Sequence, residues 1–135
     1  MKAIAIIPAR MASSRFPGKP LAEIHGLPMV AHCFFRTQMC SDLIKTYVAT
    51  CDQEIADYVT SIGGNAILTS DSHERATDRT AEAMLKAEKD LGFKVDVIVM
   101  VQGDEPMVTP KMISLALTPF NEGEDIKVVN LMASI

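Results

Sequence analysis

The 135-residue sequence has no tryptophan, few aromatic residues (5%) and only three cysteines. The cysteines, Cys33, Cys40 and Cys51, lack metal-ligand spacing, and their odd number argues against a disulfide framework. No apolar run approaches the ~20 residues of a membrane span. The apolar segment 3–9 is broken by proline and arginine, which fits a buried strand better than a signal peptide. We therefore expect one cytoplasmic domain that is not in a membrane.

Positive charge is also scarce overall. The chain has 13 basic and 17 acidic residues and a formal charge of −4, which excludes nucleic-acid binding by bulk positive charge. The first twenty residues are an exception, because they carry Lys2, Arg10, Arg15 and Lys19 and no acid. Unless these cations cluster by chance, a local basic group on an acidic body suits a compact anionic ligand.

Apolar runs alternate with segments of helical periodicity. Strands are predicted at Ala3–Ile7, Thr46–Thr50, Ala66–Thr69, Val95–Val101 and Lys127–Ala133. Helices are predicted to begin at Pro28, after Asp52, near Thr77 and after Thr109. This alternation predicts a three-layer α/β fold, with a mostly parallel sheet covered by helices on both faces. In such a fold, ligands bind beyond the carboxyl ends of the strands.

The sequence also predicts a helix cap, the apolar face of one helix and a long loop. Asp52 is placed to cap the helix that follows it. The helix from about Thr77 to Leu91 is predicted to present Ala81, Met84, Leu85 and Leu91 on its apolar face. Residues 9–27 are predicted to form a long loop.

The loop after the first strand has the composition of a phosphate-binding segment. It carries Arg10, Arg15 and Lys19 together with two serines, and Gly18 frees its backbone. Arginine can form paired hydrogen bonds with phosphate oxygens, and lysine supplies a mobile charge. The loop is not a P-loop, because serine and proline stand at two defining positions, and the chain has no dinucleotide-binding G-x-G-x-x-G motif. The alternatives are a phosphate-binding loop of another type and a solvated surface loop.

A second polar segment, residues 102–106, follows the most apolar predicted strand. A carboxylate at Asp104 would be costly there without a cation. Mg²⁺ takes one or two carboxylates together with substrate phosphates, so Asp104 is a candidate Mg²⁺ ligand. The alternative is a simple polar turn.

The loop sequence P-A-R-x-x-S-S-R-F-P-G-K-P-L resembles the signature of the CMP-Kdo synthetases, cytidylyltransferases that activate 3-deoxy-manno-octulosonate (Kdo). Further similar stretches are residues 22–30, 47–52, 63–64, 68–70 and 101–106, so the resemblance extends from about residue 3 to the end. It implies the Rossmann-like fold of nucleotide-diphospho-sugar transferases. It also implies transfer of CMP from CTP to a 3-deoxy-2-keto sugar acid with release of pyrophosphate, for lipopolysaccharide synthesis.

The resemblance assigns roles to residues that match the family's motifs. It implies Arg10, Lys19 and Asp104 as catalytic residues, with Asp104 as the ligand of an Mg²⁺ cofactor and Gln102 near the sugar acid. The implied substrate-binding residues are Ala9, Arg10, Ser13, Arg15, Lys19, His73, Thr77, Asp78, Arg79 and Gln102. Arg75, which does not match the family's motif, is a further candidate substrate-binding residue.

The segment 69–79 departs from the family's T-S-x-x-H-x-S-G-T-D-R pattern. Arg75 and Ala76 stand where serine and glycine are expected, and alanine cannot adopt every glycine conformation cheaply. Arg75 either adds an anion contact or points to solvent. From spacing alone, Asp78 and Arg79 would be a helix-start acid and a surface ion pair.

Members of the family are roughly twice as long as this chain. We therefore expect residues 1–135 to be the N-terminal nucleotide-binding portion of an enzyme whose later sequence binds the sugar and forms a homodimer. Such a portion would bind CTP without turnover. The alternatives are a nucleotidyltransferase for another acidic sugar or nucleotide, and a non-catalytic nucleotide-binding domain.

Overall fold

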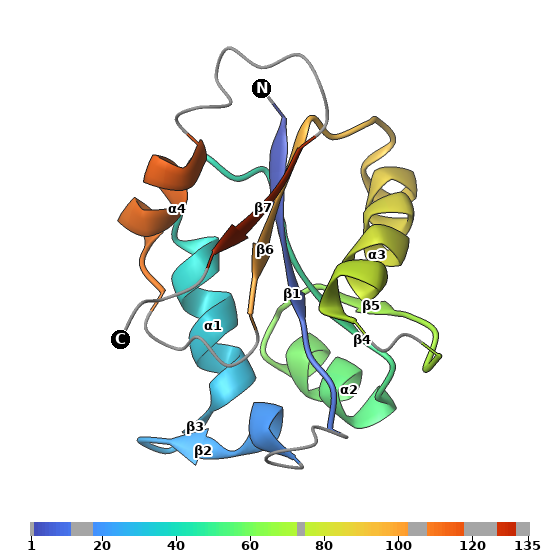
Figure 1. Cartoon of the computed structure of the whole chain (residues 1–135). Helices are drawn as coiled ribbons and strands as arrows, with labels where there is room; N and C mark the ends of the chain where they lie inside the picture. Colours follow the sequence, from blue (N-terminus) through green and yellow to red (C-terminus); the bar gives the residue numbers. More distant parts are fainter. Residues whose placement is uncertain (1, 12–17, 73–74, 103–107, 118–126, 132–135) are drawn as a thin grey trace.

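The computed structural model describes residues 2–11, 18–72, 75–102, 108–117 and 127–131 (Figure 1). Its main sheet contains β1 (Ala3–Pro8), β4 (Thr46–Thr50), β5 (Ala66–Leu68), β6 (Val97–Val101) and β7 (Lys127–Leu131). The strand order is β5-β4-β1-β6-β7, and every neighbouring pair is parallel. The short strands β2 (Glu23–Ile24) and β3 (Leu27–Pro28) form a separate antiparallel pair.

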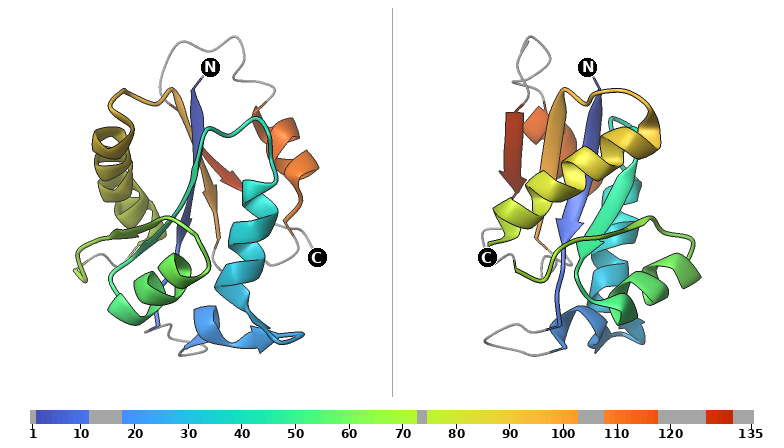
Figure 2. Two further views of the ribbon diagram at one scale, coloured as in Figure 1. Left: turned by 180° about the vertical axis from the view of Figure 1, so that it is seen from behind. Right: turned by 90° about the vertical axis from the view of Figure 1, so that its right-hand side faces the viewer.

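Helices cover both faces of the main sheet, which confirms the predicted layers (Figures 1 and 2). The helices α1 (Met29–Gln38), α2 (Gln53–Ser61) and α4 (Pro110–Leu117) contribute to the hydrophobic core on one face. The longest described helix, α3 (Ala76–Leu91), packs with the opposite face. A short 3-10 helix, η1 (Lys19–Leu21), and the strand β2 lie within the part of the 9–27 segment that the structure describes, where the sequence predicted only a loop.

The central position of β1 determines where the chain can bind a ligand. All six of its residues are buried, and Ile6 is paired in register with Tyr47 of β4 and with Met100 of β6. Such continuous burial is expected for a parallel strand covered on both faces. The segment after Pro8 therefore leaves the middle of the sheet, at the edge where parallel sheets bind ligands.

The apolar face predicted for α3 was partly wrong. Ala81 and Leu85 are exposed, whereas the fully buried residues of the helix are Arg79, Thr80, Ala83 and Ala87. The helix packs on the sheet through the two small alanines, and the predicted Met84 and Leu91 pack against the same core while partly buried. Leu85 is larger and more apolar than these alanines, but it lies on the solvent side of the helix with 59% of its surface exposed.

Two helix starts also differ in detail. Pro28 is the N-cap residue of α1 rather than its first helical residue. Asp52 occupies the N-cap position of α2, as predicted, but its side chain makes no capping hydrogen bond. Its carboxylate instead accepts a hydrogen bond from the backbone N–H of Met11. In contrast, Thr109 caps α4 as predicted, because its Oγ1 accepts a hydrogen bond from the N–H of Met112.

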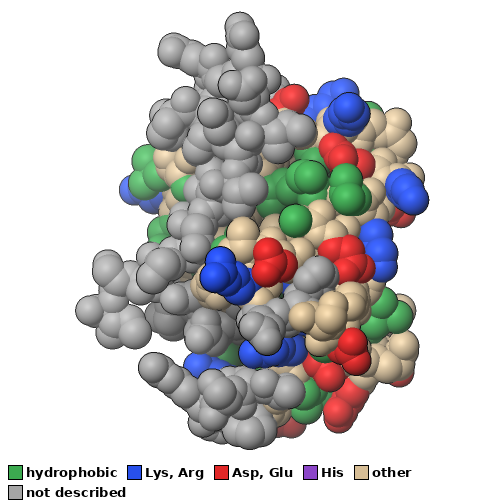
Figure 3. Space-filling view, turned by 45° about the vertical axis from the view of Figure 1, so that its right-hand side comes forward, with side chains coloured by type: hydrophobic (Ala, Val, Ile, Leu, Met, Phe, Trp, Pro, Cys, Tyr) green, Lys and Arg blue, Asp and Glu red, His purple; other side chains and the backbone are tan. Residues whose placement is uncertain are grey.

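Among the described helices, none combines the length and the apolar character needed to cross a membrane. On the face seen in Figure 3, basic and acidic side chains are interspersed around a group of hydrophobic side chains.

Candidate functional site

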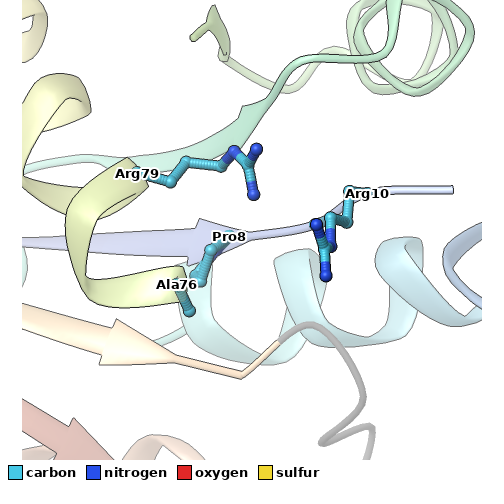
Figure 4. A pocket seen from close by; sticks show the side chains of 5 residues that line it. Pro8, Arg10, Ala76 and Arg79 are labelled. Atoms are coloured by element: carbon cyan, nitrogen blue, oxygen red, sulfur yellow. The ribbon is translucent and has the colours of Figure 1, made fainter. Parts of the chain in front are cut away.

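A pocket of about 180 Å³ lies at the carboxyl end of β1. It is lined by Pro8, Ala9, Arg10, Ala76 and Arg79 (Figure 4). Pro8 ends β1, Ala9 and Arg10 follow it directly, and the last two residues come from the first turn of α3. The fold therefore brings together two segments that the sequence analysis had assigned to one ligand, and it does so at the predicted edge of the sheet.

Arg79 is the most unusual residue of this pocket. It is only 3% exposed, so the surface ion pair suggested by spacing is wrong. Its Nε donates to Oγ1 of Thr69 at 3.0 Å, and Nη2 lies 3.5 Å from the carbonyl oxygen of Ser70. Among the described residues it forms no ion pair. Because burial of a cation is costly without a compensating negative charge, an anionic ligand is the natural partner.

Arg10 supplies a second guanidinium to the pocket. The preceding residue, Ala9, is buried and donates its backbone N–H to the carbonyl of Ala49 at 2.9 Å. This bond extends the pairing of β1 with β4 by one residue and sets the direction in which Arg10 leaves the sheet. Figure 4 shows the Arg10 and Arg79 side chains reaching toward the same space beyond the end of β1.

The N-terminus of α3 adds further positive potential. Arg75 is its N-cap residue and Ala76 its first residue, and the helix start has no side-chain cap. The first N–H groups of a helix are unpaired within the helix, and the helix dipole places a partial positive charge there. With Ala76 in the pocket wall, this 16-residue helix begins beside the two arginines. The combination suits a phosphate-bearing ligand.

Some of the other predicted site residues lie in the described part of the chain, and some lie outside it. Lys19 lies half-buried in η1, directly after Gly18, whose φ of +80° favours glycine. Gln102 is the residue after β6, and its carbonyl accepts a weak hydrogen bond from Cys33 Sγ at 3.8 Å. Arg75, Thr77 and Asp78 are exposed. Lying outside the described residues are Ser13, Arg15, His73 and Asp104.

The described part of the chain contains no candidate metal site built from its own side chains. Within it, no three His, Cys, Asp or Glu side chains are grouped as a metal site would require. The Nε2 atom of His32 forms a hydrogen bond with the carbonyl oxygen of Ile24 at 2.7 Å.

The sequence analysis did not assign Pro8, Ala76 or Thr69 to the site. Pro8 and Ala76 line the pocket, and Thr69 holds the Arg79 side chain. A useful signal was available for Thr69, since it ends a predicted strand, and Arg10 lies shortly after the end of another. Polar residues at the ends of neighbouring parallel strands meet at one edge of the sheet.

Together, the parallel sheet and the cationic pocket define a protein of the α/β class with a site suited to an anionic ligand. The sequence profile of the family described as cytidylyltransferase matches residues 4–135. The chain therefore belongs to the cytidylyltransferase family.

Relatives of this chain are named 3-deoxy-manno-octulosonate cytidylyltransferase. One from Trichlorobacter lovleyi is 44% identical over 135 residues, which are 100% of this chain and 51% of the relative. One from Escherichia coli is 38% identical over 134 residues, which are 99% of this chain and 52% of the relative. The chain thus spans about half the length of the relatives that it matches.

Solved structures agree with the fold. A CMP:2-keto-3-deoxy-manno-octonic acid synthetase complexed with CTP matches with a TM-score of 0.83 and 38% identity. The match covers 91% of this chain and 48% of the synthetase. A 4-diphosphocytidyl-2C-methyl-D-erythritol synthase matches with a TM-score of 0.68 at 15% identity, over 87% of this chain and 54% of the synthase. The second match is a likeness of fold alone.

Proposed function

We propose that this chain binds CTP in the pocket between β1 and α3. We further propose that it is the nucleotide-binding portion of an enzyme that transfers CMP to a 3-deoxy-2-keto sugar acid, Kdo or a close relative. The observation that carries the proposal is the buried Arg79, which shares the pocket with Arg10 and has no acidic partner among the described residues. The names of the relatives and the CTP complex of the structural match support the choice of nucleotide and sugar.

In this reaction, the anomeric hydroxyl of the sugar acid attacks the α-phosphorus of CTP. A new phosphorus–oxygen bond forms, the bond to the pyrophosphate group breaks, and the hydroxyl proton is released. Such transfers require positioning and charge neutralisation and little covalent work by the protein. Arg10, Arg79 and the N-terminus of α3 would hold and neutralise phosphate oxygens. Lys19 is proposed to contribute a further cation, and Gln102 a contact to the sugar acid.

Mg²⁺ is part of the proposal as a cofactor. Asp104 is the residue proposed to hold it, since one carboxylate beside substrate phosphates is the donor set that Mg²⁺ commonly uses. The ion would supply further neutralisation of the triphosphate charge. We expect Asp104→Asn to remove the Mg²⁺-dependent part of CTP affinity, as measured by calorimetry with and without Mg²⁺, and to leave the Mg²⁺-independent part unchanged.

The nucleotide half of the proposal is tested by calorimetric titration of the chain with CTP, UTP, GTP and dTTP in the presence of Mg²⁺. We expect CTP to bind most tightly. Binding of none of the four would refute the proposal, and preference for another nucleotide would refute the choice of CTP. The transfer half is tested by pyrophosphate release from CTP on addition of Kdo. CTP binding without release would identify this chain as a nucleotide-binding portion that does not turn over alone.

A related activity on another acidic sugar is the second candidate. The observation that favours it is Ala76, whose side chain lines the pocket where the family has glycine, beside the exposed Arg75. Pyrophosphate release with other 2-keto-3-deoxy sugar acids distinguishes the two candidates. Release with one of these acids and not with Kdo would favour the second.

A further inference from the structure

The carboxyl end of β4 connects two parts of the pocket through hydrogen bonds. On the α3 side, Arg79 Nε donates to Oγ1 of Thr69 at 3.0 Å, and the N–H of Thr69 donates to the carbonyl of Thr50 at 2.9 Å. Thr50 is fully buried. Its hydroxyl continues the connection, because Oγ1 accepts a hydrogen bond from the N–H of Asp52 at 3.1 Å.

On the other side, Asp52 holds the segment that carries Arg10. Its Oδ2 accepts a hydrogen bond from the N–H of Met11 at 2.8 Å. The carbonyl of Met11 in turn accepts a hydrogen bond from the N–H of Gly18 at 2.8 Å. Both backbone polar groups of Met11, the residue directly after Arg10, are therefore bound. Thr50 and Asp52, called here the β4 brace, thus link the backbone at Arg10 with the side chain of Arg79.

Two features indicate that this arrangement serves the site. An aspartate at the N-cap position normally stabilises its own helix by binding an N–H of the first turn, yet Asp52 makes no such bond in α2. In addition, a carboxylate near a cationic pocket repels an anionic ligand by Coulomb's law. The charge of Asp52 still interacts favourably with the dipole of α2, but the side chain makes no capping hydrogen bond and does not favour an anionic ligand. What it does provide is a fixed position for Met11.

We infer that Thr50 and Asp52 are positioning residues for the nucleotide site, which hold Arg10 at the separation from Arg79 that a triphosphate requires. This inference rests on the proposed binding of CTP. A positioning role and a purely electrostatic role of Asp52 predict opposite changes in CTP affinity when the side chain is removed. If the hydrogen bond matters, its removal weakens CTP binding, and if only the negative charge matters, its removal strengthens CTP binding.

The test compares CTP affinity by calorimetry in Asp52→Asn, Asp52→Ala and Thr50→Val. Asp57→Ala is the matched control, because Asp57 lies on the exposed surface of α2 and bonds only the side chain of Gln53 among described residues. We expect Asp52→Ala to bind CTP at least tenfold more weakly than Asp57→Ala. Asp52→Asn keeps an oxygen acceptor without the charge, so it is expected to bind CTP as tightly as the wild type or more tightly. Thr50→Val is expected to weaken binding in the same direction as Asp52→Ala.

Equal affinities in Asp52→Ala and Asp57→Ala would overturn the inference, and so would equal weakening in Asp52→Asn and Asp52→Ala. Amide hydrogen exchange gives a second readout that does not require a nucleotide. In Asp52→Ala, the Met11 amide should lose protection, while the amide of Val48, bonded to the carbonyl of Asn65 in the sheet, should keep it. Unchanged protection at Met11 would also refute the brace. If the wild-type chain binds no CTP, the proposed function fails, whatever the exchange at Met11 shows.

Discussion

Replacement of Arg79 by methionine should weaken CTP binding and leave the free energy of unfolding without CTP unchanged or higher. Arg79 is 3% exposed, and within the described structure its side chain donates hydrogen bonds to the hydroxyl of Thr69 and the carbonyl of Ser70. Methionine is also long and flexible, so it can fill much of the same space without a charge. The substitution therefore removes a buried cation and its potential phosphate contacts without a large loss of packing.

The expected changes in CTP affinity and in stability follow from the contacts of the guanidinium with and without bound CTP. A hydrogen bond to a charged group is worth about 1.5–3 kcal/mol, so loss of one phosphate contact should weaken CTP binding roughly 10- to 150-fold. In the protein without nucleotide, the variant loses the bond to Thr69, which has the same charged donor and is also worth about 1.5–3 kcal/mol. It also avoids the desolvation penalty of an unpaired cation, which amounts to several kcal/mol. We expect the free energy of unfolding without CTP to be unchanged or higher.

Urea denaturation with and without CTP measures both effects. At a CTP concentration one hundred times Kd, the wild type should gain about 2.7 kcal/mol, and a variant with hundredfold weaker binding should gain under about 0.5 kcal/mol. Lys89→Met is the control, because Lys89 lies exposed on the same helix, and it should retain the full gain. A variant Arg79→Met that is strongly destabilised without CTP but keeps the wild-type gain would show that Arg79 is structural, which contradicts the reasoning.

Three further predictions concern stability, all measured by chemical denaturation. Gly64→Ala should cost about 1–3 kcal/mol, because a Cβ would lie 2.7 Å from Val59 Cγ1 and 3.0 Å from the Val59 carbonyl oxygen; a cost near zero would contradict this packing. Thr37→Val should stabilise the protein by about 1 kcal/mol, because the buried Thr37 hydroxyl has no partner among described residues; a loss would show that the hydroxyl is bonded. Burial, followed by the hydrogen bond to Asp90, raises the pKa of Tyr47, so above about pH 10 the unfolded state releases this proton before the folded state does. The wild type should then lose up to about 1.4 kcal/mol per pH unit relative to Tyr47→Phe, and parallel profiles above pH 10 would refute the raised pKa.

The sheet could be predicted from sequence because its strands carry their own signal. Thr46–Thr50 begins and ends where the sequence placed it, since a short β-branched and apolar run is bounded by polar residues. The alternation of such runs with helices is enough to predict parallel pairing. The pocket followed from the same reasoning, because Arg10 and the 69–79 segment both follow strands of one parallel sheet.

The roles of Arg79 and Asp52 could not be predicted from local spacing. Spacing placed Arg79 on a helix surface and Asp52 at a helix cap, which are the favourable local positions for those residue types. In the structure, the decisive partners are distant in sequence: Thr69 for Arg79, and for Asp52 the N–H of Met11, 41 residues away. Tertiary contacts therefore override the local preference at both positions, and both positions belong to the pocket or to its support.

Arg75 and Ala76 replace the family's serine and glycine. This replacement changes the wall of the pocket and requires no unusual backbone conformation. Glycine is favoured where φ is positive, because other residues adopt such a conformation only at a cost. Here Arg75 has extended backbone angles (φ −108°, ψ 143°), and Ala76 begins α3. His25 is the single described non-glycine residue with positive φ, so neither Arg75 nor Ala76 is strained. What alanine adds is a methyl group in the wall of the pocket that Pro8 and Arg79 also line. The substitution is thus compatible with the helix start, and its consequence should appear in which ligand fits the pocket.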